Sequence, residues 1–454
     1  MCIIGGGAEG LAAAAWLAGR GFKAVVAERN EACGGRCTTR EFHPGFKASP
    51  FADELAAIPA DIFRALDLAR RGAILAPGAS CGSPEADSLR QAVVRRVMED
   101  AARAKPRGLF ARLPPPQPWP GEELAARSLA AAVATPRMSL PGTVCDPTLA
   151  GSALTMLAGA PGGMAAGGLG ALGAALRRAA EEAGAEITCG LEVTDVRRKG
   201  KRILGVGLAD GSEIAARAII STLDIRRTFL SLFAWNELPR EVVERVGAFS
   251  LAPGTARLLV ALEAPPGRSA GRNGEYLRNP IHVSPAPLQD AYRAWRGATI
   301  QNPPAVVRLL TAVDPTLAPD GAATLTVTLG AIPHTPFDGA WTKEKRDKLR
   351  SMALAAVEMA LPGALQRLKA TELLVPPDME NLIGVTEGDL MGGALSASQM
   401  LGFRPFPQCR GTRTPVEGLY LAGPSSTLGP VATCASGVAA ATAVMADFAA
   451  GRLK

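Results

Sequence analysis

Residues 2–36, CIIGGGAEGLAAAAWLAGRGFKAVVAERNEACGGR, contain the clearest indication of the fold. A short apolar segment at 2–4 is followed by three glycines and then by a run of small helix-forming residues. A second apolar segment, residues 23–27, ends at Glu28. This order of strand, glycine turn, helix and strand is typical of the βαβ unit that binds dinucleotides. The first strand is unusually short, and we expect either its neighbours to hold it or the chain to begin further upstream.

The glycine spacing by itself is weak support for a binding loop. With 50 glycines in 454 residues, roughly 0.6 matches to G-x-G-x-x-G are expected by chance. The sequence holds two matches, at 5–10 and at 168–173. Only the first follows an apolar strand and leads to an acidic residue after a second strand. We therefore assign the cofactor loop to 5–10 and expect a helix at 168–173 that packs closely against another segment or against the cofactor.

The first loop has the chemistry that a diphosphate requires. Glycine permits a tight turn and a close approach of the backbone, and the N-terminus of the following helix favours negative charge. The carboxylate of Glu28 is placed to accept hydrogen bonds from the adenosine ribose and to repel a 2′-phosphate, which disfavours NADP. The residues predicted to bind the cofactor in this part of the chain are Gly5, Gly7, Ala8, Glu9, Gly10, Glu28 and Arg29.

A second glycine pair distinguishes FAD from NAD. Gly34, Gly35 and Arg36 follow Glu28 as E-x5-G-G-R. A second stretch of glycine backbone can reach the same diphosphate, and the arginine supplies a positive charge. NAD sites do not require this feature, whereas flavoproteins with two dinucleotide-binding units carry it. The spacing therefore predicts an FAD site.

The C-terminal part of the chain is predicted to complete that site. Residues 418–423 form an apolar strand that ends in Gly423 and Pro424, and a small-residue helix follows. Backbone amides near the start of this helix are expected to face the pyrimidine edge of the flavin and to stabilise its negative charge when reduced. The predicted contacts there are Val431, Ala432 and Thr433.

Composition excludes several other classes of protein. Apolar residues make up 48% and charged residues 20% of the chain, as in a globular protein rather than a disordered one. Only 3 Tyr and 5 Trp are present, which argues against a stacking surface for nucleic acid. The 3 histidines show no ligand spacing, so we expect no metal site. The 8 cysteines are scattered, as in a reduced cytoplasmic protein, and no redox dithiol is expected from Cys33 and Cys37.

The apolar runs and the net charge raise the question of whether the chain crosses or contacts a membrane. Two long uncharged runs, 147–176 and 422–446, are long enough to cross a bilayer, but Gly, Pro, Ser and Thr interrupt both. We interpret them as buried or cofactor-facing segments. No signal peptide is expected, because Glu9 interrupts the N-terminal stretch. The net charge of +7 favours anions, so a peripheral contact with an anionic membrane surface stays an open alternative.

Helix-like and strand-like stretches alternate along the chain, which predicts an α/β protein. The fold class is a two-dinucleotide-binding, Rossmann-like FAD domain with an inserted α+β substrate domain. The expected FAD domain is discontinuous, 1–52 with 160–225 and 396–454, and the substrate domain is 53–159 with 226–395. Helices are expected at 85–103, 171–183 and 343–360, strands at 256–262 and 323–329, a hairpin turning at Asp210-Gly211, and a proline-rich spacer at 114–120.

The order of these motifs resembles the phytoene desaturase-like FAD-dependent oxidoreductases. The nearest branch is the one called pyridine nucleotide-disulfide oxidoreductase domain-containing protein 2. The resemblance extends over 2–49, 167–196, 216–230, 385–407 and 414–430. It implies FAD bound by the two glycine loops, Glu28 and the loop after Gly423, and a backbone contact from Val193 to the adenine. It also implies hydride transfer to or from carbon–carbon bonds of hydrophobic substrates such as polyenes.

Two departures from the family pattern concern the region next to the flavin. Thr427-Leu428 stands where relatives often have His-Pro. Asp389-Leu390-Met391-Gly392 stands where they often have N-I-F-H-G or N-I-F-Q-G. The chain is also shorter than usual across 53–150. These differences leave the substrate and the turnover itself open.

The catalytic residues are not evident from the sequence. Arg404, in the segment FRPFP, is the one candidate beside the flavin, with a structural, salt-bridged arginine as the equal alternative. The pair Arg226-Arg227 is expected to begin a surface helix. Three functions stay open: a desaturase or saturase that uses quinone or oxygen as electron acceptor and acts on a hydrophobic, isoprenoid-like substrate; an amine oxidase-type flavoenzyme; and a flavin-binding assembly protein without turnover.

Overall fold

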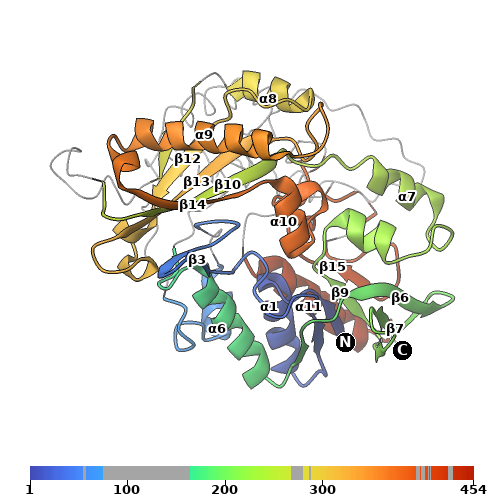
Figure 1. Ribbon diagram of the computed structural model, residues 1–454. Coiled ribbons are helices and arrows are strands. Elements are labelled where there is room, and N and C mark those ends of the chain that lie inside the picture. The colour runs from blue at the N-terminus through green and yellow to red at the C-terminus, as the bar shows by residue number, and fades with distance from the viewer. Residues whose placement is uncertain are drawn as a thin grey trace, which may run out of the picture.

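The computed structural model describes residues 1–54, 58–74, 164–266, 280–285, 288–394, 399, 404–406, 408–409, 411–427 and 433–453. Two five-stranded sheets dominate these residues, one parallel and one antiparallel. Figure 1 shows the antiparallel sheet, with helix α9 across it, above the layer of helices α6, α1 and α11. The predicted proline-rich spacer and the helix at 85–103 lie outside the described residues.

The parallel sheet is assembled from distant parts of the chain. Its strand order is β15-β9-β1-β2-β5, and all neighbouring pairs are parallel. The strands are β1 (Cys2–Ile4), β2 (Val25–Ala27), β5 (Glu186–Thr188), β9 (Ile219–Ser221) and β15 (Leu419–Leu421). The short β1 is fully buried between β2 and β9. It is therefore held by its neighbours, as one of the two expectations proposed.

Small residues allow the helices over this sheet to pack closely. Helix α1 (Ala8–Ala18) contacts α6 (Leu169–Glu182) and α11 (Ala435–Ala449). The alanines at 12–15 of α1 are all buried in that contact. A Cβ at Gly437 of α11 would lie 2.0 Å from the carbonyl oxygen of Glu9 in α1. Only glycine permits this approach, which brings the start of α11 next to the start of α1.

Two smaller sheets flank the parallel one. A hairpin pairs β3 (Arg40–His43) with β4 (Phe46–Ala48). A three-stranded sheet contains β6 (Val193–Lys199), β7 (Arg202–Leu208) and β8 (Glu213–Ala215), all antiparallel. Its predicted turn is confirmed, because Gly211 has a φ of +85° and the Asp210 carboxylate accepts a hydrogen bond from Ser212 N.

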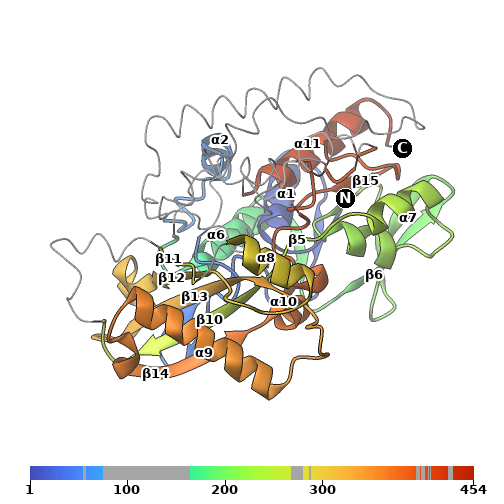
Figure 2. The ribbon, with the colours of Figure 1, turned by 90° about the horizontal axis from the view of Figure 1, so that it is seen from above.

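The second large sheet has the order β11-β12-β13-β10-β14. Its strands are β11 (Ile281–Val283), β12 (Ala305–Leu309), β13 (Ala323–Ile332), β10 (Gly254–Leu262) and β14 (Leu368–Leu374). Helix α9 (Lys343–Ala360) packs its Leu349, Ala353 and Val357 on one face, against strand residues such as Leu258 and Val327. Figure 2 shows α9 and α8 (Leu288–Arg296) over the same sheet. The helix predicted at 343–360 is confirmed, as are the strands at 256–262 and 323–329.

Shorter elements complete the described chain. The remaining helices are α2 (Ala60–Ala65), α7 (Arg240–Gly247), α10 (Pro376–Ile383) and the single turns η1 (Arg227–Ser231), η3 (Leu310–Ala312), η4 (Pro315–Leu317), η5 (Ala364–Arg367) and η6 (Thr386–Gly388). Of the helices in the described ranges, none is long and apolar enough to span a bilayer. The predicted fold class is confirmed, whereas the domain boundaries stay a prediction.

Candidate cofactor site

The first glycine loop leaves its outer side open to a cleft. Gly5 has a φ of +98°, which favours glycine, and a Cβ at Gly10 would lie 2.0 Å from the Gly5 carbonyl oxygen. Gly7 is the N-cap of α1, with extended backbone. The nearest atom to a Cβ at Gly7 is the Gly35 Cα, 4.0 Å away. The loop therefore offers backbone, without side chains, to a ligand at the start of α1.

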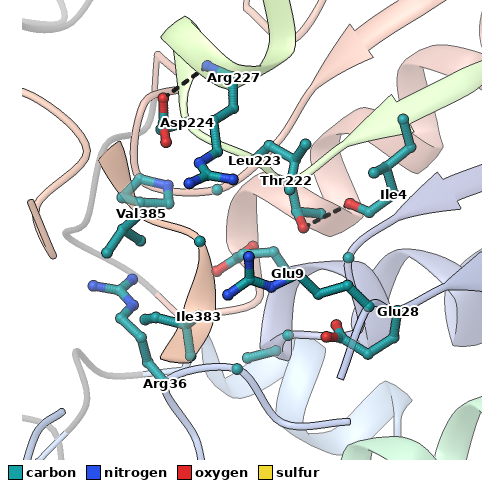
Figure 3. Close-up of a pocket in the computed structure, with 18 of the residues that line it drawn as sticks. Ile4, Glu9, Glu28, Arg36, Thr222, Leu223, Asp224, Arg227, Ile383 and Val385 are labelled. Atoms are coloured by element: carbon teal, nitrogen blue, oxygen red, sulfur yellow. Dashed lines mark hydrogen bonds between the residues drawn. The ribbon is translucent and has the colours of Figure 1, made fainter. Parts of the chain in front are cut away.

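Glu28 connects the end of β2 to this loop. Its side chain is only 6% exposed. One carboxylate oxygen accepts a hydrogen bond from Gly6 N at 2.6 Å, and the other accepts one from Asn30 N at 2.9 Å. Each oxygen keeps a second lone pair for a further donor. A pair of ribose hydroxyls is a suitable donor, because Glu28 also lines the cleft (Figure 3).

The second glycine loop lies directly against the first. Gly34 N donates to Gly6 O at 2.9 Å, and Gly7 and Gly34 form an isolated parallel bridge. Gly35 has a φ of +53°, and a Cβ there would lie 3.1 Å from the Gly7 Cα. Arg36 donates to the carbonyl of Leu390 and lines the cleft. The two glycine loops and Arg36 thus form one continuous wall of the cleft, in which the loops contribute backbone rather than side chains.

The second G-x-G-x-x-G match has a different role from the first. Gly170 N donates to the Thr39 hydroxyl at 2.9 Å. A Cβ at Gly173 would lie 2.5 Å from the Cys37 carbonyl oxygen and 3.4 Å from the Gly34 Cα. The segment against which this helix packs is therefore the chain around the second glycine loop. Of the two partners expected for 168–173, the protein segment is the one observed.

The cleft encloses about 1290 Å³ between protein atoms, part of it open to solvent. Most of the predicted cofactor residues line it: Gly5, Gly7, Ala8, Glu9, Glu28, Arg29, Gly35, Arg36, Val193, Gly423, Pro424 and Thr433. Gly10 and Gly34 lie behind the wall, where each allows close backbone packing. Val431 and Ala432 lie outside the described residues. Binding of a cofactor by these residues stays a prediction.

The opposite wall contains some residues, such as Asp224, that the motifs did not indicate. Asp224 follows β9, and its carboxylate accepts hydrogen bonds from Arg227 N and from both Thr386 N and its hydroxyl. Figure 3 shows Asp224 and Arg227 on one side of the cleft and Glu28 on the other. Thr222, Leu223, Ile383, Gly384, Val385, Asp389 and Gly392 also line it. The position of Asp224 at the carboxyl end of a parallel strand is a signal that could have indicated it.

Arg226 and Arg227 begin the short helix η1, as predicted, but their side chains do not lie freely on the surface. Both side chains are only about a quarter exposed, at 28% and 27%. Arg226 pairs with Glu387 at 3.1 Å, and Arg227 pairs with Glu380 at 3.4 Å. These contacts connect the chain after β9 to the segment 380–388, which borders the cleft. Their acidic partners are more than 150 positions away, so local spacing could not reveal them.

Asp389 organises the loop that follows this segment. It is 2% exposed and accepts hydrogen bonds from the backbone N–H groups of Ala252, Met391 and Gly393, at 3.0, 2.8 and 2.7 Å. Burial raises the pKa of Asp389 to about 6, against the opposing effects of these donors and of Arg404. The carboxylate thereby holds a tight loop at the edge of the cleft.

Arg404 holds the same loop through its carbonyl groups. It is 1% exposed and donates to the carbonyls of Gly392 at 2.8 Å, Gln399 at 3.1 Å and Pro424 at 2.8 Å, among others. Burial lowers its pKa to about 10, and the nearby Asp389 opposes that shift. Arg404 is not among the residues that line the cleft. Its contacts are those of a structural arginine bonded to backbone carbonyls.

Glu9 occupies the donors at the start of α11. Its carboxylate accepts hydrogen bonds from Cys434 N at 2.7 Å, Ser436 Oγ at 2.8 Å and Gly437 N at 2.8 Å. Burial raises the pKa of Glu9, and these donors and Arg36 oppose the shift. The amides of Cys434 and Gly437 are therefore engaged by protein. The predicted amide contact to the flavin rests on the residues before Cys434.

No metal centre is found among the described residues. They contain no group of three or more His, Cys, Asp or Glu side chains that could hold an ion. His334 Nε2 lies 2.9 Å from Glu380, and the His43 ring packs against Phe46. The side chain of His282 lies outside the described residues.

Comparisons with known proteins place this geometry in context. Residues 3–66 match the family described as NAD(P)-binding Rossmann-like domain. The mouse pyridine nucleotide-disulfide oxidoreductase domain-containing protein 2 is 29% identical over 294 residues, which is 62% of this chain and 51% of that protein. The 4,4'-diaponeurosporene oxygenase of Staphylococcus haemolyticus is 26% identical, over 53% of this chain and 46% of the relative. Cyclohexylamine oxidase from Brevibacterium oxydans has a similar structure, with a TM-score of 0.62, 15% identity and 99% coverage of both chains.

The chain spans about half the length of the curated relatives it matches. The comparisons confirm the resemblance to phytoene desaturase-like oxidoreductases, and with it FAD as the cofactor of the group. The structural neighbour has the same fold as the described residues. The reaction and the substrate of this chain are not decided by these similarities.

Proposed function

We propose that this protein is an FAD-dependent oxidoreductase that moves a hydride between a carbon atom of a hydrophobic substrate and flavin N5. The observation that carries the proposal is the wall in which Gly7, Gly35, Glu28 and Arg36 meet at one cleft. FAD, when bound, supplies the hydride acceptor or donor. The polyene or isoprenoid class of substrate, with desaturation or saturation as the reaction, is the preferred form of the proposal.

The residues of the chain bind and orient the cofactor. A Cβ at Gly7 would project into the space that a diphosphate needs, whereas glycine leaves it free. Glu28 is held by Gly6 and Asn30 in a position to accept from ribose hydroxyls. Arg36, anchored on the Leu390 carbonyl, places a positive charge in the same cleft. These three features fit the charge and the hydroxyl groups of FAD.

The substrate class is supported by two named relatives. The curated relatives include a 4,4'-diaponeurosporene oxygenase and a 4,4'-diapolycopene oxygenase, whose names denote polyene substrates. The proposed electron acceptor is a quinone or oxygen. A cytoplasmic setting, with peripheral contact to an anionic membrane, is part of the proposal because such substrates reside in lipid and the chain carries a net charge of +7.

An amine oxidase-type reaction on a polar substrate is the second candidate. It is favoured by the face of the antiparallel sheet opposite α9, which carries buried polar residues. Arg257 and Thr328 lie opposite each other there, as do Arg308 and Thr326. Arg257 pairs with Asp53 at 2.6 Å. Solved structures of similar fold include cyclohexylamine oxidase and putrescine oxidase.

Anaerobic reduction of the flavin separates the candidates. The purified protein, loaded with FAD, is mixed without oxygen with a polyene in detergent micelles or with a primary amine. Bleaching of the flavin absorbance by the polyene supports the preferred form, and bleaching by the amine supports the second. A protein that binds FAD but is reduced by neither behaves as a flavin-binding protein without turnover. Failure to bind FAD overturns the proposal.

A further inference from the structure

Two cysteines from distant parts of the chain meet behind the cofactor cleft. The Cys33 and Cys189 sulfur atoms lie 3.6 Å apart although the residues are 156 positions apart. Cys33 precedes the second glycine loop, and Cys189 directly follows β5. Backbone hydrogen bonds from Gly190 N to Asn30 O and from Leu191 N to Glu28 O hold the two segments together. The contact between the thiols therefore follows from the packing of the sheet edge.

The surroundings of the pair differ from those of the other described cysteines. Both thiols are partly exposed, whereas Cys2, Cys37, Cys409 and Cys434 are buried. Burial and the contact with Cys189 raise the pKa of Cys33 to about 12, and Glu28 adds to this effect, while Arg177 opposes it. Cys33 is therefore a weak nucleophile. The first attack is therefore assigned to Cys189.

We propose that Cys33 and Cys189 form a peroxide-sensitive modification site that closes to a disulfide. The Cys189 sulfur attacks one oxygen of hydrogen peroxide, the O–O bond breaks, and a sulfenic acid and one water result. The Cys33 sulfur then attacks the Cys189 sulfur, the S–O bond breaks, and a second water leaves as the S–S bond forms. Together the two thiols lose two electrons, which reduce one molecule of hydrogen peroxide to two waters.

The disulfide would act on the loops that line the cofactor cleft. A Cβ at Gly6 would lie 2.6 Å from the Cys33 sulfur, so this sulfur touches the first glycine loop. The bond would tie the segment 28–35 to the end of β5, across a closed loop of 156 positions. Such a cross-link restricts the unfolded chain, so the oxidised protein is expected to have a Tm higher by about 5 °C.

Peptide mapping of the full chain tests the proposal. The protein is treated with a small excess of hydrogen peroxide, its remaining thiols are alkylated, and it is digested with trypsin without reduction. Cleavage after Arg29, Arg36, Arg178 and Arg197 places Cys33 and Cys189 in separate peptides, each without another cysteine. The expected result is a disulfide-linked pair of peptides 30–36 and 179–197 in most molecules.

Matched variants make the outcome decisive. Cys189→Ser and Cys33→Ser are expected to abolish the linked pair and the rise in Tm, whereas Cys409→Ser keeps both. Alkylation of both cysteines after peroxide treatment, or a link from Cys33 to Cys37, overturns the proposal. The mass measurement needs neither FAD nor substrate, so its failure is distinguishable from a failure of the proposed function.

Discussion

The two walls of the cleft are constructed by different physical means. The N-terminal wall, 5–10 with 28–36, consists mainly of backbone whose shape depends on glycines at particular positions. The opposite wall, 222–227 with 383–392, is held by side chains bonded to distant backbone groups. The shape of a ligand-facing surface can therefore be specified by local glycine spacing, as in the first wall, or by long-range hydrogen bonds, as in the second. Substitutions in the first wall should therefore mainly lower FAD affinity, whereas substitutions in the second should mainly change stability.

The largest effect is expected from Arg404→Met in the support of the second wall. The methionine leaves the carbonyls of Gly392, Gln399 and Pro424 without their donor in a buried site. We expect a loss of about 4 kcal/mol in the free energy of unfolding, measured by urea denaturation. The exposed Arg240→Met is the control, and its denaturation curve should overlay that of the wild type. An unfolding free energy within about 1 kcal/mol of the wild type would contradict the structural role of Arg404.

Gly7→Ala tests the first wall. The φ of Gly7 is −74°, which alanine adopts readily, and no protein atom lies closer than 4.0 Å to the new Cβ. Stability should therefore change little, whereas FAD affinity should fall about 100-fold, or about 2.7 kcal/mol, by titration calorimetry. Gly247→Ala, at a glycine with open space around it, is the control. Unchanged affinity would show that the ligand does not approach Gly7.

Asp389→Asn tests the second wall through pH. The pKa of Asp389 is raised from 3.8 to about 6, so the folded protein binds this proton more tightly than the unfolded chain. Its contribution to stability is therefore present below about pH 4 and is lost as the pH rises to about 6, by about 3 kcal/mol in total. The variant lacks this loss, so its stability relative to the wild type should rise over that interval. Parallel curves for the two proteins would refute the assignment.

The smallest effect is expected from Arg227→Ala. Its ion pair with Glu380 is partly exposed, so the loss of stability should stay below about 1 kcal/mol. Because Arg227 lines the cleft, FAD affinity should fall about threefold, or about 0.7 kcal/mol. Arg226→Ala is the matched control, since Arg226 pairs with Glu387 but is not among the cleft residues. Equal FAD affinities in the two variants would show that Arg227 does not contact the cofactor.

The first wall could be predicted because its requirements are local. A positive φ at Gly5 and Gly35, and the close approach of Gly10 to Gly5, each demand glycine at a particular position. The second wall could not be predicted in this way. Asp389 and Ala252 are 137 positions apart, and nothing in the residues around Asp389 indicates that partner. The residues around Arg404 likewise do not distinguish a catalytic arginine from a structural one, because carbonyls that it binds lie in other segments.

Local sequence specifies the βαβ unit, the acidic end of the second strand at Glu28, the glycine pair at 34–35 and the small-residue helices. These features depend on backbone conformation and on side-chain size, which neighbouring residues specify. Three contacts follow from tertiary packing instead: Gly168–Gly173 against the second glycine loop, Arg404 with backbone carbonyls, and Cys33 with Cys189. Those contacts join segments far apart in the chain, and their partners become evident only when the sheet brings them together.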